Sequence, residues 1–142
     1  MRELVFHLGK RRQIMMGVVV ALGVLAVAIS FNFQITPTSY FGGKYNSYFL
    51  IGLVAYKFIE LPILYYVLLH RHIIHLRKNV NYQDQTLKIR KHARLLLFLI
   101  PQGNTVFGII AYKLSGNVLY FLFFSLIALI TLILINPNKL IE

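Results

Sequence analysis

The sequence contains no cysteine and no tryptophan, and only four of its 142 residues are acidic. The missing thiols exclude disulfide bonds, thiolate nucleophiles and cysteine-ligated metal centres. The chain also lacks a glycine-rich phosphate loop and a serine beside a base. A catalytic site needs a nucleophile or an acid–base group with a partner, so these absences argue against an enzyme. We expect no cofactor, and a membrane-embedded lipid-modifying enzyme is only the third hypothesis.

Charged residues are scarce as well, at 13% of the chain, whereas soluble domains carry about 25%. The hydrophobic residues, 58% of the total, are gathered into long blocks. A soluble amphipathic core would show alternating or helical-period patterns, whereas apolar blocks of about 18 residues or more indicate a bilayer. The sequence therefore predicts an integral membrane protein.

The apolar blocks predict an all-α fold, with four transmembrane helices in one antiparallel bundle over residues 1–142. The predicted spans cover about 14–35, 48–69, 95–114 and 117–135, and a basic loop occupies 70–94. At 1.5 Å per residue, each span is long enough for about 30 Å of hydrocarbon. The start of the first span, "KRR" and then "AVAIS", is also typical of a secretory signal, but the apolar run is longer than a usual signal core. The preceding "MRELVFHLG" predicts a short amphipathic helix on the membrane surface.

The distribution of cations predicts the orientation. Twelve of the fifteen Lys and Arg residues fall before the first span, in the loop 70–94 or after the fourth span. By the positive-inside rule, both termini and this loop are cytoplasmic. A bacterial plasma membrane is our default location for so compact a chain.

The middle of the second span, "AYKFIELPIL", contains two opposite charges and a proline. Charges at the bilayer centre cost about 2.5 to 3.5 kcal/mol each, which makes insertion of this span marginal. Lys57 and Glu60 are three residues apart and therefore share a helical face, so they can pair. Pro62 removes a backbone hydrogen bond and is expected to kink the helix.

The third span contains "IPQGNTVFG", which places several polar residues beside a second predicted kink, at Pro101. Polar residues of three spans are expected at one depth, where bundles place binding sites or internal hydrogen-bond networks. This predicted polar layer consists of Lys57, Glu60, Gln102, Asn104, Thr105 and Ser125.

Two roles for this layer stay open. An intramembrane ion pair can hold helices in register or bind a partner helix, which suits a non-catalytic subunit or scaffold of a membrane complex, formed with other subunits or copies of itself. Alternatively, Glu60 titrates with Lys57 as its counter-charge, in a small oligomeric proton- or ion-coupled transporter or channel. Four short helices enclose little volume for a solute, so the subunit is the leading hypothesis.

The cytoplasmic segment is rich in cations and histidines. Its cations are expected to contact anionic lipid headgroups, at about 1 kcal/mol each, and comprise Arg71, Arg77, Lys78, Lys88, Arg90 and Lys91. No nucleic-acid-binding motif accompanies them, so we expect no nucleic-acid partner. In "HRHIIH" only His72 and His75 share a helical face, which makes them weak candidates for a metal site, and we predict none.

Overall fold

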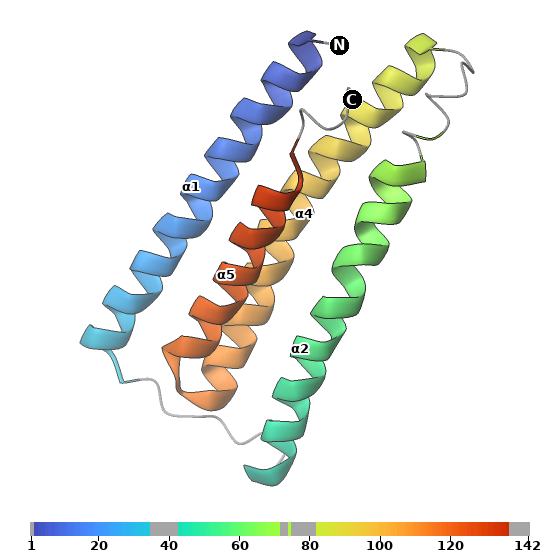
Figure 1. Ribbon diagram of the computed structural model, residues 1–142. Helices are drawn as coiled ribbons and strands as arrows, with labels where there is room; N and C mark the ends of the chain where they lie inside the picture. Colours follow the sequence, from blue (N-terminus) through green and yellow to red (C-terminus); the bar gives the residue numbers. More distant parts are fainter. Residues whose placement is uncertain (1, 35–42, 72–73, 75–81, 137–142) are drawn as a thin grey trace.

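The computed structural model describes residues 2–34, 43–71, 74 and 82–136. Within these ranges the chain is helical and contains no strand, which confirms the all-α prediction. The elements are α1 (Arg2–Asn32), α2 (Gly43–Tyr65), the π-helical turn η1 (Tyr66–His70), α4 (Tyr82–Ser115) and α5 (Val118–Leu134). Figure 1 shows them as a bundle of long rods, with α1 and α2 on opposite flanks of the pair α4 and α5.

Three of the helical segments are long and apolar enough to cross a membrane: Val5–Asn32, Asn46–Leu68 and Leu87–Ser115. Helix α5 is strongly apolar but shorter, with 17 residues. These lengths are those of an integral membrane protein. Helix α1 is continuous from Arg2, so "MRELVFHLG" extends the first predicted span as one helix and does not form a separate surface helix. Leu8 of this segment is buried in the bundle, which holds the segment against the other helices.

A tight turn makes α4 and α5 antiparallel neighbours. Gly116 has a φ of 68°, a conformation that glycine adopts without strain. Asn117 then caps α5, because its side-chain oxygen accepts a hydrogen bond from the backbone N–H of Leu119 at 2.9 Å. Further along the pair, Gly108 of α4 faces Phe121 of α5 so closely that an added Cβ would lie 2.9 Å from the ring.

The core is built around α4. At the end nearest the chain termini, side chains of α1, α4 and α5 form one buried cluster that includes Leu8, Leu96 and Leu132. At the opposite end, α2 joins α4 and α5 in a second cluster around Leu50 and Phe124. Arg12 also links α1 to the end of α5, donating from Nη1 to the carbonyl of Ile135 at 3.3 Å. A cation at a helix C-terminus is favourable because that end carries a partial negative charge.

The close approach at Gly108 generates a first prediction. Gly108→Ala would place a methyl group against the Phe121 ring and backbone, so we expect it to destabilise the hairpin by about 1 to 3 kcal/mol. Thermal unfolding in detergent, followed by circular dichroism, measures the loss. Gly17→Ala is the matched control, because no atom lies within 4 Å of its added Cβ. Equal melting temperatures for the two variants would contradict the proposed packing.

Candidate functional site

Lys57 lies at the midpoint of the apolar segment Asn46–Leu68 and is buried, with 2% of its surface exposed. It is among the largest fully buried side chains of the described residues. A lysine is almost never fully buried unless its charge is paired. The groups that surround its ammonium therefore show how this charge is accommodated in the middle of α2.

Three groups surround the Lys57 ammonium. Its Nζ lies 2.5 Å from Oε2 of Glu60, one helical turn along α2. On α4, the Phe107 ring centroid is 4.4 Å away, within the range of a cation–π interaction. Gly103 leaves the space for Nζ, because a Cβ at this position would be 3.0 Å from it. The ammonium therefore sits in a notch on α4, with a carboxylate on one side and an aromatic face on another.

Glu60 is placed differently from its partner, because 24% of its side chain is exposed. Among the described residues, its carboxylate has one partner, Lys57. The exposed residues that flank it are apolar or aromatic: Tyr56 one turn before, Ile63 one turn after, and Val67 of η1 two turns after. The cation of the pair is thus enclosed by α4, whereas the anion lies at the open edge of the contact.

The polar residues of the third predicted span lie on different sides of α4. Asn104 is 1% exposed and donates from Nδ2 to the Ile100 carbonyl at 2.8 Å, while its Oδ1 is buried without a partner among the described residues. Thr105 donates to the carbonyl of Pro101 at 2.7 Å. Gln102 is exposed. These hydrogen bonds return to the backbone of the same helix, as is common for short polar side chains in helices.

Ser125 belongs to α5 and is half-buried. It lines an apolar groove of about 420 Å³ between α1 and α5, together with Val20 and Leu126. The structure therefore brings Lys57 and Glu60 together with Gly103 and Phe107, and places Ser125 in a groove to which neither charged residue contributes. Neither Gly103 nor Phe107 was among the predicted site residues. Their signal in the sequence is weak, since a glycine and a phenylalanine are ordinary in an apolar helix.

Both predicted kink residues lie inside helices that continue past them. Pro62 is within α2, and one turn later the chain forms the π-helical turn Tyr66–His70. Proline leaves a carbonyl unbonded one turn back, and π-turns are common at such irregular points and at functional sites. Pro101 is within α4, two residues before the notch at Gly103.

The basic residues predicted to contact lipid are only partly within the described ranges. Arg71, Lys88 and Lys91 are exposed and Arg90 is half-buried. Arg77, Lys78, His72 and His75 lie outside the described residues. The described part of the chain has no group of three or more His, Asp or Glu side chains that could hold a metal ion.

No family model, curated protein or solved structure matches the chain.

The enclosed cation generates a second prediction. Removing the counter-charge by Glu60→Gln leaves the Lys57 ammonium buried and unpaired, so we expect a loss of about 3 kcal/mol of unfolding free energy. Replacing both charges, by Lys57→Met with Glu60→Leu, should restore most of that stability, because apolar residues of similar size often substitute for a buried pair without loss. Unfolding in mixed detergent micelles measures both. A double variant as unstable as the single one would show that the charges do not act as a pair.

Proposed function

We propose that this protein is a non-catalytic subunit of a membrane complex, and that it binds a partner helix at the open side of α2, next to Glu60. We propose that four helices cross the membrane and that both termini are cytoplasmic. The orientation is supported by the twelve cations that the sequence concentrates on one side. Helix α5, about 26 Å long, would cross with slight thinning of the bilayer. The plasma membrane of a bacterium is the proposed location.

The half-open ion pair is the observation that carries this proposal. Oε2 of Glu60 binds Lys57, but the carboxylate also has free acceptor capacity and is 24% exposed at the middle of an apolar helix. Polar groups at this depth are costly against lipid and usually have protein partners. A neighbouring subunit that covers Glu60 with a hydrogen-bond donor would remove this cost.

The surface around Glu60 suits helix packing. Tyr56 and Ile63 of α2 and Val67 of η1 are exposed along the same side, and α2 packs chiefly against α4. Helices in lipid associate through close packing and interhelical hydrogen bonds, without a hydrophobic driving force. An exposed apolar face with a carboxylate in its middle offers both kinds of contact.

The charge balance of the site specifies the partner. Lys57 and Glu60 already neutralise each other, so a charged partner group would leave a net charge in the membrane. A neutral donor avoids this. We therefore propose a transmembrane helix of another subunit that carries a Ser, Thr, Asn or Gln at the depth of Glu60. Such interhelical hydrogen bonds contribute about 1 to 2 kcal/mol in model helices.

Photo-crosslinking tests this surface. A photoreactive residue in place of Ile63, which is 55% exposed beside Glu60, should capture one discrete membrane protein in cells at native expression. The same residue in place of Val24 is the control, because Val24 is 66% exposed on α1, at the opposite flank of the bundle. The Lys57→Met/Glu60→Leu background should weaken capture about tenfold, through loss of the acceptor.

The outcomes separate clearly. A crosslinked product of twice the chain mass would identify the partner as a second copy of this protein. Capture from Val24 but not from Ile63 would move the interface to α1. A chain that purifies in mild detergent as a monomer, without crosslinks from Ile63, would contradict the subunit proposal.

A small oligomeric proton- or ion-coupled transporter is the second candidate function. The buried Oδ1 of Asn104 favours it, because this atom has no partner among the described residues and could bind a hydrated proton or cation one residue from the notch at Gly103. Against it, the hydrogen bonds of Asn104 and Thr105 stay within α4 and do not extend from Glu60 toward either end.

Flux measurements in proteoliposomes distinguish the two functions. We expect no proton- or cation-coupled flux from the purified wild-type chain. Flux that Glu60→Gln abolishes, while Asn104→Leu reduces it and the protein still inserts, would establish the transporter and replace the subunit proposal.

A further inference from the structure

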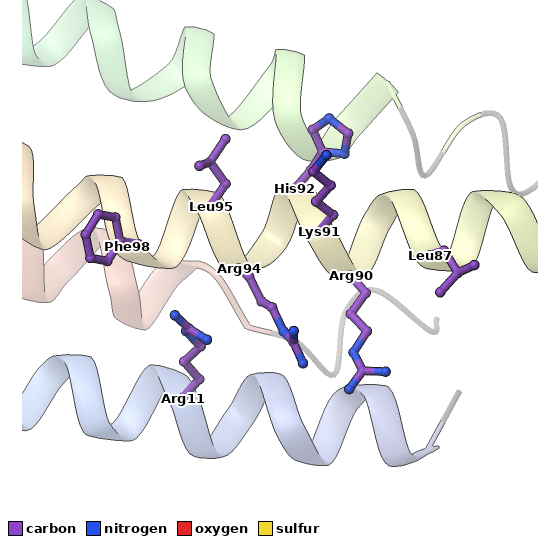
Figure 2. A pocket seen from close by; sticks show the side chains of 8 residues that line it. All are labelled: Arg11, Leu87, Arg90, Lys91, His92, Arg94, Leu95 and Phe98. Atoms are coloured by element: carbon purple, nitrogen blue, oxygen red, sulfur yellow. The ribbon is translucent and has the colours of Figure 1, made fainter.

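A second site candidate lies where the N-terminal part of α4 passes α1. Three arginines meet there: Arg11 of α1 and Arg90 and Arg94 of α4. They line a cavity of about 650 Å³. Figure 2 shows the side chains of Arg90 and Arg94 extending from α4 toward α1, and that of Arg11 extending from α1 toward α4. The three arginine side chains thus enter the space between the two helices from both sides, one after another along it.

The charges of these arginines are not balanced within the described residues. None of the three forms an ion pair or hydrogen bond there, and Nε of both Arg11 and Arg90 is buried without a partner. The Nε of the adjacent Arg12 is also buried without a described partner, but its Nη1 donates to the carbonyl of Ile135. Like charges repel one another, and buried donors without acceptors are destabilising. An anion in the cavity would remove both penalties.

The rest of the cavity lining contains both polar and apolar side chains. Lys91 and His92 also line it, and Figure 2 shows their side chains on the other side of α4 from those of Arg90 and Arg94. Leu95 and Phe98 follow toward the apolar middle of the helix. Leu87 lines the cavity at the end toward the loop, and Figure 2 shows Arg11 at the level of Leu95, so cationic and apolar side chains alternate along the space. A ligand that fills it therefore combines an anionic group with apolar parts.

We propose that this cavity binds the phosphate group of an anionic phospholipid, with an acyl chain along Phe98 toward the apolar middle of α4. Guanidinium groups suit this role because each can donate two parallel hydrogen bonds to phosphate oxygens. Basic pockets between transmembrane helices on the cytoplasmic side are known to bind anionic headgroups. The site differs from general attraction to a charged surface, because it depends on Arg11 of a helix that precedes the basic loop.

Native mass spectrometry of the 142-residue chain in detergent tests this site, with phosphatidylglycerol as the probe and phosphatidylcholine as the zwitterionic comparison. We expect wild type to retain phosphatidylglycerol selectively. Arg11→Gln with Arg94→Gln should weaken retention by about 30-fold or more, because two charge-assisted contacts are lost. Lys10→Gln with Lys113→Gln is the matched control. Both lysines are exposed on the same two helices, lie outside the cavity lining and carry the same total charge.

The retention of phosphatidylglycerol by the variants distinguishes a specific phosphate site from general attraction. Selective loss in the arginine variant, with the lysine control close to wild type, supports a built phosphate site. Equal losses in both variants would overturn it in favour of diffuse surface attraction. Displacement of the lipid by millimolar inorganic phosphate would also overturn the lipid assignment, since a free anion would then be the occupant. If the arginine variant does not fold, Arg11→Lys retains the charge but loses the two-pronged contact, and it should still weaken retention severalfold.

Discussion

The enclosure of the Lys57 ammonium by α4 is the contact on which the arrangement of α2 depends. A charge midway along an apolar helix is tolerated only when a neighbour covers it, and here the cover consists of the notch at Gly103 and the ring of Phe107. The contact sets the rotation of α2 about its own axis. Glu60, one turn further on, is thereby turned to the edge of the α2–α4 contact. The open carboxylate is thus a consequence of how the cation is buried.

Helix α4 is central because every other helix packs on it, and its different sides have different chemistry. Toward α5 it is closely packed, with Gly108 against Phe121. Toward α2 it holds the ion pair, and toward α1 its arginines face Arg11 across a cavity without a described counter-charge. Protein contact is proposed at the α2 side and lipid contact at the α1 side. Under these proposals, separate surfaces would let the protein bind lipid and a partner helix independently.

Part of this architecture could be predicted because it depends on local patterns. Apolar blocks of sufficient length predict helices, and a spacing of three residues places Lys57 and Glu60 on one face. Local patterns did not predict which side chains of a helix would contact its neighbours. The segment "MRELVFHLG" shows an amphipathic pattern but continues α1, because Leu8 finds a packing position in the bundle. Asn104 and Thr105 were expected in a shared polar layer, yet their hydrogen bonds return to the backbone of α4, a choice that sequence spacing does not reveal.

The sequence by itself determined the class of the protein, the approximate helices and the pairing of two charges, since these follow from composition and from contacts within one turn. Only the tertiary structure decided which charge is enclosed and which is open, because that depends on Gly103 and Phe107 of another helix. It also decided that Arg11 meets Arg90 and Arg94, residues about eighty positions away in the chain. Contacts between helices depend on the rotation and register of packed side chains, and a hydropathy pattern contains neither.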